Sequence, residues 1–189
     1  MRPGAVDVLS DKMKINYWQN KTNVLQYKQS RYDFGNILWL IDEGENMERF
    51  KLVTSVHLIL IKEGKVLLLR RYHTGYEDGN YSVVAGHIDG NESVIKAMQR
   101  EAMEEAGIKI QETDLKIVHV MHRKSEDREN IDYFFECKNY EGTIRIMERD
   151  KCDELQFYDI NKLPSNTIPY IRKALDVYQK GEPFSIYGW

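Results

Sequence analysis

Residues 86–108 read GHIDGNESVIKAMQREAMEEAGI and contain the clearest structural pattern in the chain. The first seven residues include two glycines, an aspartate and an asparagine, which are typical of a loop. From Ser93 onward no helix breaker occurs before Gly107, and glycine commonly ends a helix because it accepts the left-handed backbone conformation. The stretch therefore predicts a loop followed by a helix over residues 93–106.

Three carboxylates on that helix, at Glu101, Glu104 and Glu105, share one arc beside the face expected to be buried. At about 100° per residue they span an arc of roughly 100°. Like charges at this spacing destabilise a helix by about 0.2–0.5 kcal/mol per pair. A solvated acidic face is the ordinary interpretation of such a cluster. The alternative is a divalent cation, which takes oxygen ligands and supplies the missing counter-charge.

The residues around the carboxylates favour the metal interpretation. Gly86 lets the backbone turn and approach a ligand closely. Glu92 and Arg100 are placed to form an ion pair that holds the loop against the helix. Gly107 ends the helix.

This spacing resembles the signature of the Nudix hydrolases. The resemblance rests on these residues: Gly86, Glu92, Arg100, Glu101, Glu104, Glu105, Gly107 and Ile108. The chain departs from the family at Ala102, where a larger aliphatic residue is more usual, and at Val84-Ala85, where many members carry a proline and a glycine. The similarity covers about residues 48–189 and leaves residues 1–46 unmatched.

The resemblance implies an α+β fold, a Nudix-type α/β/α sandwich with a mixed sheet, in which the motif forms a loop–helix–loop. It also implies a hydrolase that uses Mg²⁺ or Mn²⁺ to cleave a phosphoanhydride bond in a nucleoside diphosphate linked to a further group. A metal suits this chemistry because it neutralises the charge of the pyrophosphate and lowers the pKa of bound water.

The resemblance further implies roles for individual residues. The metal ligands are Glu101, Glu104, Glu105 and the carbonyl of Gly86, and Arg100 is counted with the catalytic group. Glu92 and Gly107 are structural members of the motif. Apart from the resemblance, substrate contacts are expected from Arg70, His87 and Glu148, and Arg71 and Arg123 are further candidates for bidentate contacts with phosphates. The general base is expected to be Glu101, with acidic residues outside the motif as alternatives: Glu126, Asp127, Glu129 and Glu148.

The rest of the chain predicts further strands and one more helix. The expected strands cover residues 52–61, 66–70, 81–85, 117–121, 132–137 and 154–158, a charged loop is expected over 122–130, and the second helix covers 169–180. Residues 36–41 form an apolar run that is a candidate strand. We expect a Nudix domain over residues 47–189 preceded by an extension of unknown role over residues 1–46, with the alternative that this extension is part of the fold.

Composition limits the classes of partner. The chain of 189 residues carries 27 Lys and Arg against 30 Asp and Glu, a net charge of −3, so it lacks the basic surface of a dedicated nucleic-acid binder. No apolar run has the length of about 20 residues that a membrane span requires. The two cysteines form no zinc pattern and indicate reduced thiols in a cytoplasmic protein.

The expected substrate is a small nucleotide of the (d)NTP type. Alternatives are a nucleotide sugar, ADP-ribose or a dinucleoside polyphosphate, and a non-catalytic nucleotide-binding module on the same fold. A homodimer is also compatible with the sequence.

Overall fold

The computed structural model describes residues 50–189, so the expected extension over residues 1–46 and its apolar run over 36–41 lie outside the described residues. The described elements, in chain order, are β1 (Val53–Lys62), β2 (Lys65–Arg71), β3 (Tyr81–Ser82), β4 (Ala85–His87), α2 (Val94–Ala106), a 3₁₀ turn (Glu112–Asp114), β5 (Leu115–Lys124), β6 (Glu129–Cys137), β7 (Cys152–Asp159), α3 (Pro169–Gln179) and β8 (Phe184–Tyr187).

Strand β1 is the centre of a mixed sheet whose order is β3-β2-β1-β6-β5-β8. It pairs in parallel with β6, from Val53 beside Asn130 to Leu60 beside Cys137. It also pairs antiparallel with β2 and with the short strand β4, while β7 joins the sheet through β2. The expected mixed sheet is therefore confirmed, and β1 connects all its parts.

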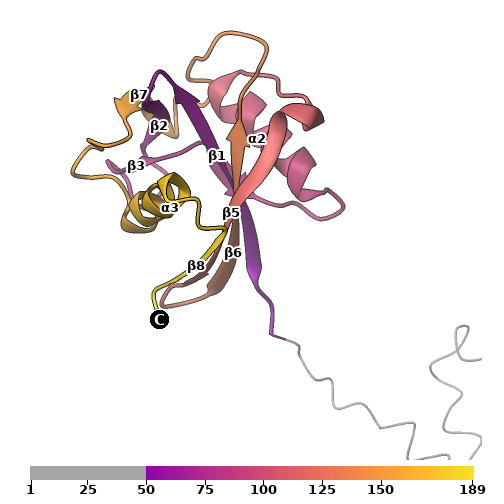
Figure 1. Ribbon diagram of the computed structural model, residues 1–189, viewed down its shortest axis with the longest axis vertical. Helices are drawn as coiled ribbons and strands as arrows, with labels where there is room; N and C mark the ends of the chain where they lie inside the picture. Colours follow the sequence, from indigo (N-terminus) through magenta and orange to yellow (C-terminus); the bar gives the residue numbers. More distant parts are fainter. Residues whose placement is uncertain (1–49) are drawn as a thin grey trace, which may run out of the picture. The chain divides into compact units, whose positions relative to one another are not determined.

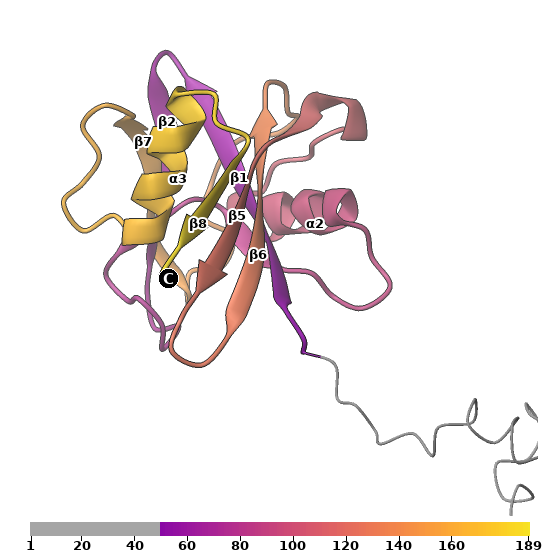
Figure 2. The same ribbon diagram turned by 60° about the horizontal axis from the view of Figure 1, so that its bottom comes forward.

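The two helices cover opposite faces of this sheet (Figures 1 and 2). Alternation along β1 explains how one strand serves both faces. Leu58 packs in the cluster that contains Ala97 and Met98 of α2, whereas the next residue, Ile59, packs in the cluster that contains Ile171 of α3. The expected α/β/α sandwich of the α+β class is confirmed. No helix among residues 50–189 is long and apolar enough to cross a membrane.

Helix α2 begins and ends as the sequence predicts. The Ser93 hydroxyl accepts a hydrogen bond from the backbone N–H of Lys96 at 3.2 Å, which satisfies a donor of the first turn. Gly107 has a φ of 68°, and its N–H donates to the carbonyls of Ala102 and Met103. Because both ends are capped locally, the carboxylate-bearing segment is a helix of defined length.

Three segments differ from the sequence-based prediction. The expected strand over 81–85 is two short strands, β3 and β4, and β4 continues into the expected loop through Gly86 and His87 because it pairs with β1. The expected loop over 122–130 is mostly strand, since β5 extends to Lys124 and β6 begins at Glu129. Strand β8 has no counterpart in the prediction, because its four residues follow a turn and are held by long-range contacts, chiefly the pairing with β5.

We expect residues 47–189 to fold as an independent domain, because both hydrophobic clusters of the described chain consist of residues between Val56 and Tyr187. A protein that starts at Met47 should show one cooperative thermal transition and keep the activity of the full chain. Circular dichroism and size-exclusion chromatography would test this. Insolubility, or loss of a dimer seen with the full chain, would show that residues 1–46 belong to the structure.

Candidate active site

A cleft of about 1040 Å³ lies between α2 and the first turn of α3. One end is lined by Glu101, Glu104 and Glu105 of α2 together with Glu148, which belongs to the loop before β7. The other end is lined by polar side chains of β1, β5 and β6 and by Tyr170 of α3. The two ends therefore differ in the side chains that line them. We call the first, with its four carboxylates, the acidic end, and the second the polar end.

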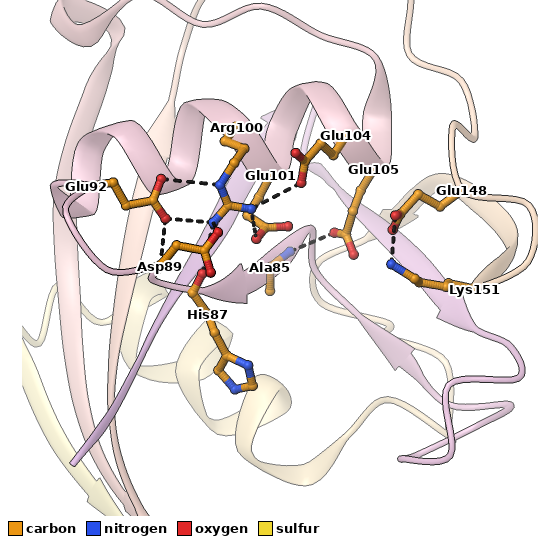
Figure 3. Close-up of polar contacts among 10 residues, drawn as sticks. All are labelled: Ala85, His87, Asp89, Glu92, Arg100, Glu101, Glu104, Glu105, Glu148 and Lys151. Carbon is orange, nitrogen blue, oxygen red and sulfur yellow. Dashed lines mark hydrogen bonds and ion pairs between the residues drawn. The ribbon is translucent and has the colours of Figure 1, made fainter. Parts of the chain in front are cut away.

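The guanidinium of Arg100 connects the loop, the helix and strand β4 (Figure 3). Its Nε and Nη2 donate to the Glu92 carboxylate at 3.2 and 2.7 Å, so the expected ion pair is present. Its Nη1 donates to Glu101 at 2.6 Å and to Glu104 at 3.1 Å. Nη2 also donates to the backbone carbonyl of His87 at 3.0 Å. One side chain thus holds two of the three carboxylates that are expected to bind the metal.

Glu92 holds the loop in place through a second contact. Its carboxylate accepts a hydrogen bond from the Asp89 backbone N–H at 2.8 Å. The hydrogen bonds from Arg100 and then from Asp89 lower the pKa of Glu92, because both favour its charged form. The structure therefore places Glu92 in a loop-holding position outside the cleft lining.

Glu105 is the least favourably placed charge of the acidic end. Its carboxylate accepts one hydrogen bond, from the Ala85 backbone N–H at 2.9 Å. Burial raises the pKa of Glu105 to about 8, and the negative charges of Glu101 and Glu148 add to this increase. The hydrogen bond from Ala85 acts in the opposite direction. A group in this position gains from a nearby cation.

Gly86 is required for packing, and the expectation that it lets the backbone turn is wrong. It lies in β4 opposite Val56, and it has no positive φ. A Cβ atom built on Gly86 would overlap the Glu101 carboxylate. Glu101 is 9% exposed, and burial raises its pKa although Arg100 acts in the opposite direction. The missing side chain of Gly86 is what gives the Glu101 carboxylate its position.

The donors at the acidic end fit a hard divalent cation. Carboxylate and carbonyl oxygens are the ligands that Mg²⁺ and Mn²⁺ prefer, and within residues 50–189 Glu105 forms no ion pair, with Arg71 as a more distant positive charge. In residues 50–189 no three His, Cys, Asp or Glu side chains converge as a ready cluster. The reason is that Glu101 and Glu104 are bound to Arg100 and Glu105 to Ala85. Binding a cation would require these carboxylates to reorient.

The expected substrate contacts are only partly brought together. Glu148 lies in the cleft beside Lys151, whose Nζ donates to it at 2.7 Å. His87 lines the cleft, but its ring points away from the carboxylates (Figure 3). Arg70 does not line the cleft, since it donates to Asp153 at 2.8 and 2.9 Å. Strand alternation in β2 turns Arg71 into the cleft in its place.

The alternative acidic residues are divided between cleft and surface. Asp127 lines the cleft and pairs with Arg128 at 2.8 Å. Glu129 lies outside the lining, where His122 contacts it at 3.1 Å, and Glu126 is an exposed residue outside it as well.

Sequence reasoning missed a buried ion pair at the polar end. Arg123 of β5 donates to Asp132 of β6 through Nε at 2.6 Å. Burial by itself would raise the pKa of Asp132, but the neighbouring His57 and Arg123 outweigh it and lower the pKa to about 2. No local pattern signals this pair, because its partners meet only through the pairing of β5 with β6.

Comparisons with known proteins agree with this geometry. The NUDIX domain matches residues 51–178. The oxidized purine nucleoside triphosphate hydrolase of Danio rerio is 31% identical over 117 residues, which are 60% of this chain and 69% of the relative.

Solved structures show the same fold at low identity. The MutT NUDIX hydrolase from Burkholderia pseudomallei is similar at a TM-score of 0.62 and 22% identity, covering 67% of this chain and 97% of its own. The MutT protein from Methanosarcina mazei Go1 is similar at a TM-score of 0.61 and 19% identity, and the match covers 70% of this chain and 96% of the MutT chain. A UDP-X diphosphatase is similar at a TM-score of 0.56 and 15% identity, and the match covers 98% of this chain and 89% of the diphosphatase chain.

The packing of Gly86 predicts that the substitution Gly86→Ala displaces the Glu101 carboxylate. We expect it to lower the free energy of unfolding by about 1–3 kcal/mol and to impair the site. Gly90→Ala is the matched control, because a Cβ atom at Gly90, in the adjoining loop, would meet no other atom within 4 Å. Its effect should stay within about 0.5 kcal/mol. Equal melting temperatures for the two variants would contradict this account of Gly86.

The position of Glu105 predicts that Glu105→Gln stabilises the metal-free protein near pH 8. The substitution removes a charge that burial and two neighbouring carboxylates disfavour. The gain should be on the order of 1 kcal/mol, or about 2–4 °C in Tm. The difference should shrink toward pH 5, where Glu105 of the folded protein is protonated. Differential scanning calorimetry in EDTA would measure both values, and a lower Tm for the variant at pH 8 would refute the prediction.

Proposed function

The chain belongs to the Nudix family, as the match over residues 51–178 shows, and is therefore a hydrolase of phosphoanhydride bonds. We propose that it is a metal-dependent pyrophosphohydrolase that acts on small nucleotides of the (d)NTP type. The acidic end of the cleft supports the metal dependence. There Glu105 is enclosed beside Glu101 and Glu148 with a single hydrogen bond to offset its charge.

The residues proposed to hold Mg²⁺ or Mn²⁺ are Glu101, Glu104, Glu105 and the carbonyl of Gly86. When bound, the metal would neutralise charge on the phosphates and lower the pKa of a coordinated water. Arg100 keeps Glu101 and Glu104 at the acidic end before substrate arrives, and both carboxylates would turn from Arg100 toward the metal when it binds. Their location matters because phosphoryl transfer depends mainly on positioning and electrostatic stabilisation.

Two carboxylates that line the cleft are proposed as candidates to accept the proton of the attacking water. Glu101 remains the proposed general base, since it lies among the other carboxylates of α2. Glu148 is the alternative from a separate loop, and its pairing with Lys151 keeps its carboxylate at the acidic end. The acidic limb of the pH profile, where activity rises as the base loses its proton, should be lost in Glu101→Gln and kept in Glu148→Gln.

The substrate class is supported by the cleft and by a relative. Arg71 lines the cleft and offers positive charge to a phosphate chain, whereas Arg128 and Lys151, which also line it, are paired with Asp127 and Glu148. The Danio rerio relative is named an oxidized purine nucleoside triphosphate hydrolase. The free, buried thiols of Cys137 and Cys152 fit a cytoplasmic enzyme.

A second candidate is a UDP-linked substrate, and one observation favours it. The UDP-X diphosphatase structure matches 98% of this chain, whereas the MutT structures from Burkholderia pseudomallei and Methanosarcina mazei Go1 match 67% and 70%. We rank it second because the Danio rerio relative, which is named for a nucleoside triphosphate, is more similar in sequence, at 31% identity against 15%.

The proposal is tested by product release from NTPs, dNTPs, 8-oxo-dGTP, ADP-ribose, nucleotide sugars and dinucleoside polyphosphates, with and without Mg²⁺. We expect Mg²⁺-dependent release of pyrophosphate from one or more triphosphates. Glu104→Gln and Glu105→Gln should each lower kcat at least about 100-fold with the fold intact, because each removes a metal ligand.

Glu112→Gln is the control, since Glu112 is an exposed residue of the 3₁₀ turn outside the cleft lining. Near-normal turnover by folded Glu105→Gln would refute the metal assignment. Cleavage restricted to UDP-linked substrates would favour the second candidate. Nucleotide binding without any turnover would indicate a binding module.

A further inference from the structure

The polar end of the cleft has a floor made by three adjacent strands. Ser55 of β1 pairs with Asp132 of β6, and His57 lies two residues after Ser55 in β1. Asn130 of β6 pairs with Arg123 of β5. Side chains at these positions share the face of the sheet that α3 covers, because alternate residues of a strand point to the same side. All five residues are at most 9% exposed.

The two charged members of the floor neutralise each other. The Arg123 guanidinium donates to both Asp132 oxygens, at 2.6 and 3.3 Å, and lies 4.2 Å from the centre of the Tyr170 ring. Since Arg123 is already paired, this end of the cleft offers little attraction to a further phosphate. The pair also fixes the positions of β5 and β6 beneath the cleft.

Two other members of the floor, His57 and Asn130, are incompletely satisfied. His57 is 2% exposed, and neither of its ring nitrogens makes a hydrogen bond within the described chain, although Nε2 lies 3.5 Å from Asp132 Oδ1. The Oδ1 atom of Asn130, also 2% exposed, has no partner there either. Buried polar atoms in proteins are nearly always hydrogen-bonded, and exceptions call for an explanation. Both residues line the cleft, so a bound molecule can supply the partners once the side chains that cover these atoms shift.

Aromatic rings hold the His57 ring in place. The His57 ring stacks on Phe134 with 4.6 Å between centroids and an angle of 17°. The Tyr170 ring, which lines the cleft, meets His57 edge-on at 6.0 Å and 77°. A bound group would therefore meet the edges of His57 and Asn130 beside the Tyr170 ring, and such a setting suits a planar heterocycle that carries hydrogen-bond donors and acceptors.

The floor is separate from the carboxylates. In β4, Gly86 faces Glu101, whereas His87 pairs with Ser55 and its ring points away from α2 (Figure 3). A nucleotide lying across β4 would therefore place its phosphates at the acidic end and its base over the floor.

We propose that His57 and Asn130 are the residues that select the nucleobase of the substrate, and that the Arg123–Asp132 pair is a positioning element beneath them. This inference rests on the proposed function, because it assumes a nucleotide in the cleft. Asn130 is suited to the role since a carboxamide can donate and accept toward one base edge at the same time. The imidazole of His57 adds a second donor or acceptor at a different point of the base.

The test is binding of AMP, GMP, CMP, UMP and the base-free ribose 5-phosphate, measured by calorimetry in EDTA so that turnover plays no part. Wild-type protein should bind one base at least about tenfold more tightly than another, and more tightly than ribose 5-phosphate. His57→Phe keeps the stack on Phe134 but removes both nitrogens, and it should reduce this selectivity to less than about threefold.

Asn130→Asp keeps the size of the side chain and replaces its donor by an acceptor, so it should change which base is preferred. Asn139→Ala is the control, because Asn139 is exposed and lies outside this cleft. Circular dichroism of each variant verifies folding, and Asn130→Asp decides the matter if His57→Phe does not fold.

Selectivity unchanged in a folded Asn130→Asp, or equal binding of all five probes by wild-type protein, would overturn the inference. The same variants assayed for kcat/KM on the four NTPs with Mg²⁺ should show the same change of base preference. If base selectivity in binding follows the variants but no NTP is cleaved, the proposed function fails and the base-selecting role of His57 and Asn130 stands.

Discussion

The structure of the acidic end depends on one cation, the guanidinium of Arg100. It joins the loop through Glu92, the helix through Glu101 and Glu104, and strand β4 through the His87 carbonyl. Without that cation, the carboxylates on this side of α2 would repel one another. Charge-assisted hydrogen bonds are stronger than neutral ones, so this network fixes the loop–helix geometry before any ligand binds.

Strand β4 turns this network into a two-sided site. Its three residues pair with β1, and alternation directs Gly86 toward α2 and His87 toward α3. The absent side chain of Gly86 makes room for Glu101. The central strand β1 continues the other face with Ser55 and His57. The carboxylates proposed to bind the metal and the residues proposed to select the base therefore lie at opposite ends of one cleft, on either side of strand β4.

Both ends contain groups that the fold by itself leaves poorly satisfied. Glu105 is enclosed beside other carboxylates, and the buried nitrogens of His57 have no hydrogen bond within the described chain. Each arrangement disfavours the ligand-free protein and favours a bound cation or a polar ligand. Local instability of this kind is common where binding or catalysis is required, and the two hydrophobic clusters of the sandwich supply the stability that tolerates it.

The sequence alone determined the features that arise from neighbours along the chain. Helix α2, its caps at Ser93 and Gly107, the Glu92–Arg100 ion pair and the shared arc of the carboxylates follow from short spacings. Tertiary structure decided what depends on strand pairing: that Arg71 and not Arg70 lines the cleft, the packing role of Gly86, strand β8, and the floor around Arg123 and Asp132. The reason is that strand pairing joins residues far apart in the chain, and a single sequence carries no local signal of which residues will meet.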